Sequence, residues 1–77
     1  MTRIQILAPG LASSEQLAEN AVKAAHLAGV VCEFERVTEA ERIMGFGVRV
    51  TPALAVDGVV KVSGRVPSAE EIRMFLR

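Results

Sequence analysis

Two β-rich runs meet at the dipeptide Asp57-Gly58, and this junction limits the possible folds more than any other feature of the sequence. Residues 53–56 are entirely apolar, and residues 59–63 are rich in valine. An Asp-Gly pair between two such runs favours a two-residue type I′ turn, in which both residues take a positive φ. We therefore predict an antiparallel hairpin over residues 53–63.

The N-terminal half predicts a parallel arrangement instead. Residues 3–8 alternate between polar and apolar and then become apolar, which is typical of a strand that enters a core. Residues 30–37 form a second β-rich run. Between them, residues 14–28 carry apolar side chains at helical spacing, and Gly29 provides a stop signal. Two strands joined by a helix are parallel, with a right-handed crossover.

The pattern Ser/Thr-x-x-Glu/Gln, a capping box, occurs three times, and each instance predicts the start of a helix. The three boxes begin at Ser13, Thr38 and Ser68. The predicted element order is β-α-β-α-β-β-α. We expect an α/β fold with a mixed four-stranded sheet and helices on both faces. At 77 residues, the chain has room for one domain, spanning residues 1–77.

Composition excludes several classes of function. The nine basic and nine acidic residues give no net charge, whereas phosphate-driven binding of nucleic acid needs a clustered basic face. There is no Trp or Tyr, so an aromatic platform for stacking bases is not expected. A single cysteine, Cys32, excludes an internal disulfide and a cysteine-rich zinc site. We expect no metal, no cofactor and no nucleic-acid partner.

Neither a signal peptide nor a membrane span is evident. The N-terminus has one early basic residue and an apolar run of only three residues before Pro9-Gly10. No stretch approaches the roughly 20 apolar residues of a membrane helix. We therefore expect a cytoplasmic protein that does not contact membranes. Cys32, placed mid-strand by the pattern, is expected to be a core thiol, and the isolated His26 is not expected to bind metal.

The element order, with Thr-Pro directly before the third strand, resembles the thioredoxin/glutaredoxin fold. The resemblance is closest to the small redox-active disulfide proteins and covers essentially the whole chain. Its most specific part is the run Thr51–Gly58, followed by Gly64-Arg65-Val66. The N-terminal part of the resemblance rests on residues 4–7, Gly10 and residues 17–20.

In that family, a C-x-x-C motif follows the glycine that corresponds to Gly10. Here Leu11 stands where the attacking cysteine would be, and Ser14 stands where the resolving cysteine would be. Exchange between thiols and disulfides needs a thiolate that attacks sulfur, which neither leucine nor serine can supply. The resemblance therefore implies the fold with the C-x-x-C motif lost, a degenerate site without the dithiol reaction.

The resemblance also implies a ligand groove. In the family, the residue before a cis-proline offers its backbone to a bound peptide or to glutathione. A cis peptide bond is therefore expected between Thr51 and Pro52. The expected groove residues are Gly10, Ser13, Ser14, Thr51, Pro52 and Arg65. Arg65 would add positive charge, and the helix N-terminus at the serines would attract an anion, unless Ser13 simply caps the helix.

Three functions remain open. We favour a non-catalytic binding module that takes a protein, a peptide or a glutathione-like thiol in the groove. One alternative is an active thioredoxin- or glutaredoxin-type oxidoreductase of redox homeostasis, which would work with glutathione or through Cys32. The other is an oligomerising scaffold or interaction protein. We expect a monomer or a weak dimer, with the second strand at an edge of the sheet.

Overall fold

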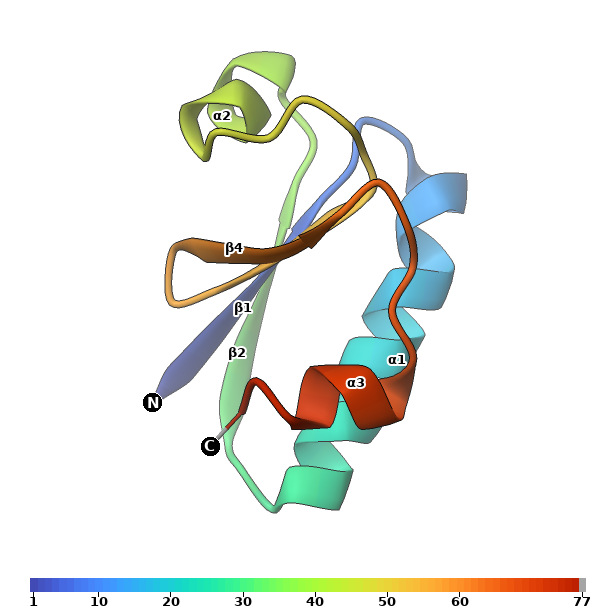
Figure 1. Ribbon diagram of the computed structural model, residues 1–77, viewed down its shortest axis with the longest axis vertical. Helices are drawn as coiled ribbons and strands as arrows, with labels where there is room; N and C mark the ends of the chain where they lie inside the picture. Colours follow the sequence, from blue (N-terminus) through green and yellow to red (C-terminus); the bar gives the residue numbers. More distant parts are fainter. Residues whose placement is uncertain (77) are drawn as a thin grey trace.

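The computed structural model describes the backbone of residues 1–76 and the side chains of residues 1–10 and 14–76. Its elements follow the predicted order (Figure 1). They are β1 (Thr2–Leu7), α1 (Leu11–Ala28), β2 (Cys32–Val37), α2 (Ala40–Gly45), β3 (Ala53–Val56), β4 (Val59–Ser63) and α3 (Ala69–Arg73). The fold class predicted from the sequence is confirmed.

The four strands form one mixed sheet in the order β2-β1-β3-β4. β1 pairs with β2 in parallel, and β3 runs antiparallel to both β1 and β4. The hairpin turn has φ of 51° at Asp57 and 83° at Gly58, as the Asp-Gly pair predicts. β1 is therefore central, and its last residue, Leu7, pairs with Val37 on one side and Ala53 on the other.

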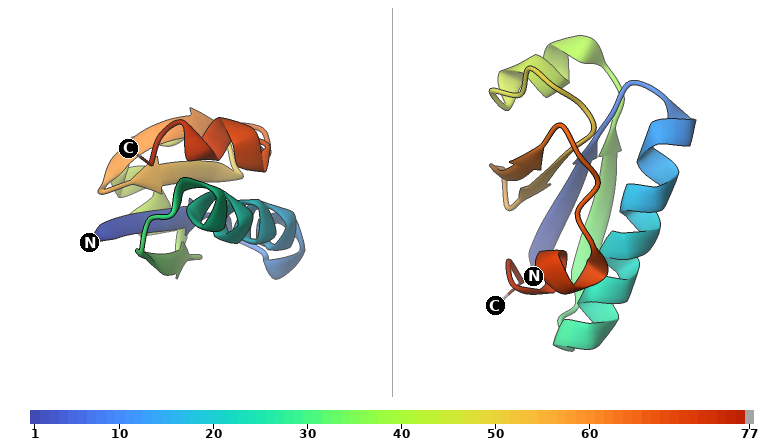
Figure 2. Two further views of the ribbon diagram at one scale, coloured as in Figure 1. Left: turned by 90° about the horizontal axis from the view of Figure 1, so that it is seen from below. Right: turned by 45° about the vertical axis from the view of Figure 1, so that its right-hand side comes forward.

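Alternation along the central strand divides the core between the two faces of the sheet. Ile4 and Ile6 face the layer formed by α1 and α3, which holds the larger apolar cluster. Leu7 faces α2 and belongs to a smaller cluster with Ile43 and Val48. Figure 2 shows α1 and α3 on one side of the sheet and α2 beyond its other side, at one end. The helices thus cover both faces, but unequally.

The first capping box does not mark the start of its helix. α1 begins at Leu11, three residues before the predicted start, and its N-cap is Gly10, which offers no side-chain cap. The cause is tertiary packing: Ser14 is only 1% exposed and extends the buried stripe of Leu17 and Ala21 by one turn. The side chain of Ser13 lies outside the described residues. The predicted end of the helix is confirmed, because Gly29 is left-handed with φ of 67°.

The other two capping boxes differ from each other. Ser68 is the N-cap of α3, and its hydroxyl accepts a hydrogen bond from the Glu71 N–H at 3.2 Å, as predicted. α2 begins at Ala40 with Glu39 as its N-cap, and no side chain caps it. Thr38 was therefore wrongly predicted as a cap, because the chain stays extended for one further residue.

Candidate functional site

Four chain segments converge at the end of the sheet where β1 and β2 terminate, at the top of Figure 1. The N–H of Ala8, just after β1, donates to the carbonyl of Val37 at 3.1 Å. Ala53 begins β3 beside Leu7, so the preceding Thr51-Pro52 pair lies next to the segment that leads into α1. We call this region the site end. It brings together the N-terminus of α1, the end of β2, the Thr51-Pro52 pair and the turn after β4.

The Thr51–Pro52 peptide bond is cis in this structure. The Pro52 carbonyl accepts a hydrogen bond from the Gly64 N–H at 2.9 Å, which joins it to the turn after β4. Gly64 has φ of 82°, and a Cβ there would lie 3.2 Å from Cγ1 of Val50, so a larger residue would crowd this approach. Within the described residues, the backbone N–H and carbonyl of Thr51 make no hydrogen bond.

Ser14 lies one turn into α1, and its side chain is buried. Its hydroxyl oxygen accepts a hydrogen bond from Nη1 of Arg36, at the end of β2, at 3.4 Å. Sequence reasoning did not assign Arg36 to the site. Strand alternation could have found it, because Arg36 shares a face with Cys32 and Phe34, and the end of a parallel strand lies beside the start of the crossover helix.

The start of α1 is electrostatically positive. An α-helix N-terminus carries about half a positive charge, because its first N–H groups have no partner within the helix. No acidic residue lies in the first turn of α1, and Gly10, the N-cap, is exposed and extended. The side chains of Leu11 and Ser13 lie outside the described residues, so the predicted roles of these two side chains stay predictions.

Arg65 follows Gly64 at the rim of the site, but its charge is already matched. Its guanidinium makes two hydrogen bonds to the Glu71 carboxylate, from Nη1 at 2.7 Å and from Nη2. These bonds lower the pKa of Glu71 and raise that of Arg65. Both side chains are solvent-accessible, so the pair contributes little to stability. Arg36 is thus the guanidinium that contacts α1 near its start.

Cys32 lies at the opposite end of the sheet from the site end. It pairs with Thr2 at the start of β1, five residue steps from Leu7, or about 17 Å at the usual strand rise. The thiol is partly buried against the larger core cluster, and Sγ donates to the Val30 carbonyl at 3.7 Å. Burial raises the pKa of Cys32, and the negative charge of Asp57 raises it further. Such a thiol is a weak nucleophile at neutral pH.

Two further kinds of site were searched for along the described chain. Among the described side chains, of residues 1–10 and 14–76, no group of three His, Cys, Asp or Glu is placed to hold a metal ion. Within residues 1–76, no helix is long and apolar enough to cross a lipid bilayer.

Comparison with known proteins agrees with this architecture. The family model for a thioredoxin domain matches residues 2–77. The chain is 42% identical over 76 residues to a protein named thioredoxin from Methanothermobacter thermautotrophicus, with 99% of each chain covered. It is 36% identical over 77 residues to a thioredoxin from Methanocaldococcus jannaschii, covering 100% of this chain and 88% of that protein. The chain therefore belongs to the thioredoxin-domain family.

Proposed function

We propose that this chain is a thioredoxin-fold binding module that has kept the family's ligand groove and lost its dithiol reaction. One observation carries the proposal. By the resemblance, Leu11 and Ser14 stand where the family has its two cysteines, and the chain's single thiol, on Cys32, lies at the other end of the sheet, about 17 Å along the strands from the level of Leu7. Cys32 is therefore too far from the start of α1 to take the place of either family cysteine.

The backbone at Thr51 supports a peptide as the ligand. An extended peptide binds by adding main-chain hydrogen bonds to an exposed N–H and carbonyl, and both groups of Thr51 lack a partner within the described residues. The neighbouring Pro52 carbonyl already accepts a hydrogen bond from the Gly64 N–H, which ties residues 51–52 to the turn after β4. The peptide would therefore run alongside residues 50–52, across the start of α1.

The charge at the site end supports a ligand with a carboxylate. The start of α1 attracts anions and has no acidic residue in its first turn. Arg36 lies beside Ser14 and can add a guanidinium contact to a bound carboxylate. Glutathione, an anionic peptide thiol, has the chemistry that this proposal requires. The cytoplasmic location expected from the sequence stays a prediction.

An oxidoreductase working through Cys32 is the competing function, and two features oppose it. The pKa of Cys32 is raised by burial and by Asp57, whereas a reactive cysteine has a lowered pKa. Cys32 also lies at the opposite end of the sheet from the Thr51 backbone that would position a substrate. A measurable turnover in an insulin-reduction assay, lost in Cys32→Ser, would establish the competing function and overturn the binding-only proposal.

Amide chemical shifts test the groove directly. The ¹⁵N-labelled protein is titrated with S-methylglutathione and with carboxymethylated insulin B chain, neither of which has a free thiol. We expect shifts at residues 10–14, 51–53 and 64–65. Arg36→Ala should weaken S-methylglutathione binding, while Arg73→Ala, an exposed arginine paired with Glu70, should not. If no groove residue shifts with either probe, the proposal fails.

A further inference from the structure

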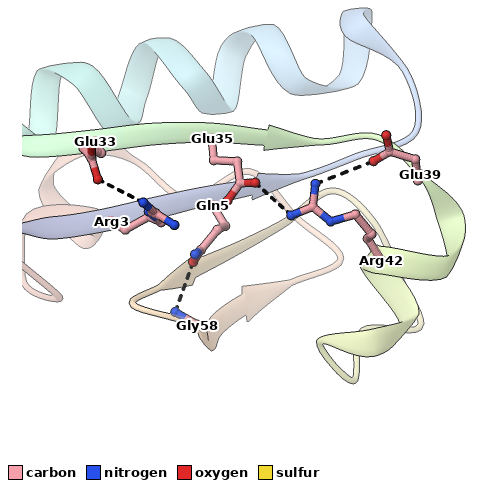
Figure 3. A network of polar contacts seen from close by, with 7 residues as sticks. All are labelled: Arg3, Gln5, Glu33, Glu35, Glu39, Arg42 and Gly58. Carbon is pink, nitrogen blue, oxygen red and sulfur yellow. Dashed lines mark hydrogen bonds and ion pairs between the residues drawn. The ribbon is translucent and has the colours of Figure 1, made fainter.

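Most arginines with described side chains are paired with a carboxylate of the same chain, as Figure 3 shows for two of them. Four arginines each form an ion pair with a glutamate: Arg3 with Glu33, Arg42 with Glu35, Arg65 with Glu71 and Arg73 with Glu70. Arg36 donates to the Ser14 hydroxyl instead. Arg49 is exposed, and its guanidinium makes no ion pair or hydrogen bond with any described residue. The arginine left without a partner in the described chain is therefore the one that precedes Thr51 by two residues.

The segment that carries Arg49 is held in place on both sides. The preceding residue, Val48, is buried in the smaller core cluster. The following residue, Val50, lies against the turn after β4, because its Cγ1 is 3.2 Å from the position that a Cβ of Gly64 would take. Two residues of chain span at most about 7 Å, so the Cα of Arg49 lies within that distance of the Cα of Thr51. Arg49 therefore lies at the site end, on a segment that packing fixes.

The unbonded backbone at Thr51 continues back to Arg49. Within the part of the chain that the structure describes, the N–H and carbonyl groups of residues 49–51 make no hydrogen bond. A peptide that pairs with Thr51 can therefore follow the same segment as far as Arg49. Alternate residues of an extended peptide lie on the same side. The ligand residue two positions from the one opposite Thr51 thus lies beside Arg49.

The loop segments that frame the groove carry positive charge and no negative charge. Residues 8–14, 46–53 and 63–69 contain no Asp or Glu, whereas they contain Arg49 and Arg65. Arg65 is paired with Glu71, which leaves Arg49 as the available cation of these segments. The acidic residues of this end of the molecule lie on α1, on α2 and its N-cap, and on β2: Glu15, Glu35, Glu39 and Glu41. Of these, both Glu35 and Glu39 contact Arg42.

A carboxylate on the ligand matches the chemistry of this arginine. A guanidinium presents a planar fork of N–H donors that fits the two oxygens of a carboxylate. The start of α1 and Arg36 attract a separate negative charge. An acidic side chain beside Arg49 therefore adds to the contact at α1 and does not compete with it.

We propose that Arg49 makes this groove selective for acidic peptides. The ligand is an extended segment of a protein, with Asp or Glu two positions from the residue that lies opposite Thr51. This inference rests on the proposed binding function, because Arg49 can contact a ligand side chain only if the peptide lies along residues 49–51.

A matched pair of blocked peptides isolates the charge: acetyl-Glu-Ala-Val-Ala-Glu-amide and its counterpart with Gln in place of both Glu. A glutamate two positions from the central Val on each side allows for either direction of the bound peptide. Each peptide is titrated into the ¹⁵N-labelled protein at low ionic strength, where exposed charges are least screened. The amide shifts of residues 10–14 and 49–53 give the two Kd values. We expect the Glu peptide to bind about fivefold more tightly than the Gln peptide.

Three variants assign this preference to Arg49. Arg49→Gln should lower the ratio of the two Kd values about threefold, and Arg49→Lys, which keeps the charge, should retain most of the ratio. Arg73→Gln changes an exposed arginine that is paired with Glu70, and as the matched control it should leave the ratio unchanged.

Two results would overturn the selectivity and leave the binding function standing: groove shifts with equal Kd values for both peptides, or an unchanged ratio in Arg49→Gln. A groove that responds to neither peptide also overturns the selectivity. The binding function is then decided by the titrations with S-methylglutathione and the insulin B chain.

Discussion

The two ends of the sheet offer opposite settings for a cysteine. The site end has the N-terminus of α1, with no acidic residue in the first helical turn, but it has no cysteine. The backbone N–H and carbonyl of Thr51 there make no hydrogen bond within the described residues. The other end, which we call the thiol end, has the only cysteine, Cys32, partly buried and near Asp57. Helix N-termini lower the pKa of a thiol, whereas burial and a nearby carboxylate raise it.

The setting of a cysteine within the fold therefore determines how much thiolate it carries. An ordinary thiol with a pKa of about 8.5 is only about 3% ionised at pH 7. The raised pKa of Cys32 makes its thiolate fraction smaller still. A thiol at the start of α1, with a pKa near 7 as in other C-x-x-C motifs, would be about half ionised. Position alone therefore changes the thiolate fraction by an order of magnitude.

Restoring sulfur at the site end should give the largest effect. We expect Leu11→Cys/Ser14→Cys, made in a Cys32→Ser background, to reduce insulin in the presence of dithiothreitol. The unmodified chain should show only the reagent's own rate. The reason is that the new thiols lie at the helix N-terminus beside Thr51-Pro52, where their thiolate fraction rises roughly 15-fold or more over that of Cys32.

The single variants Leu11→Cys and Ser14→Cys, in the same background, are the matched controls. Neither can form the intramolecular disulfide, so neither should turn over. An inactive double variant that folds normally by circular dichroism would show that the site end differs from a working dithiol site by more than the two cysteines. The contrast between the two ends would then not be enough to account for the proposed loss of the dithiol reaction.

The second prediction compares the packing at the two ends. Ile72 of α3 is fully buried in the larger cluster, and Ile43 of α2 is buried in the smaller one. We expect Ile72→Ala to lower the free energy of unfolding by about 4 kcal/mol and Ile43→Ala by about 2 kcal/mol, because the smaller cluster can collapse around the lost volume. Urea unfolding followed by circular dichroism measures both. Equal losses would show that α2 is held as firmly as α3.

Much of the fold could be predicted because local signals and packing agree. The Asp57-Gly58 turn requires positive φ at both positions, and these residues tolerate it, so the hairpin formed where it was expected. The start of α1 was mispredicted at Ser13. There the burial of Ser14 against the sheet outweighs a local cap, and a single-sequence pattern does not contain that information.

The candidate site was predictable only in part. Thr51-Pro52 and Gly10 could be recognised because proline and glycine mark turns between elements, and both lie at one end of the sheet. Which arginine lies free to contact the start of α1 depends on the side-chain partners that each arginine finds in the folded chain. Arg65 is paired with Glu71, six residues along, while Arg36 contacts Ser14 from another strand. Such pairings follow from tertiary structure, so the contact between Arg36 and Ser14 was missed, and the expected place of Arg65 in the groove stays a prediction.

Helix caps give a third and smaller test of the difference between the ends. Ser68 caps α3, whereas neither Gly10 nor Glu39 provides a side-chain cap for α1 or α2 at the site end. We expect Ser68→Ala to lower the free energy of unfolding by about 1 kcal/mol, because the Glu71 N–H loses its acceptor. Thr38→Ala, its sequence-matched control, should change it by less than about 0.5 kcal/mol. A larger loss in Thr38→Ala would mean that α2 is capped after all.

The smallest effect concerns the pH dependence of the thiol end. The pKa of Cys32 is higher in the folded chain than in the unfolded one, so folding favours the neutral thiol. This contribution to stability is fully present below the unfolded pKa, about 8.5, and is lost as the pH rises through the folded pKa. Between about pH 7 and about pH 10, the native chain should therefore lose slightly more stability than Cys32→Ser.

Asp57→Asn separates the two causes of that shift. Asparagine tolerates the positive φ of this turn position and keeps the oxygen that accepts the Arg3 N–H at 2.9 Å, but it removes the charge. The pKa of Cys32 should fall part of the way towards its ordinary value, because burial, the larger cause, remains. The pH dependence of alkylation by iodoacetamide measures this pKa. Full return to the ordinary value in Asp57→Asn would mean that the thiol is not shielded by burial, and the thiol end would then differ from the site end by its charge alone.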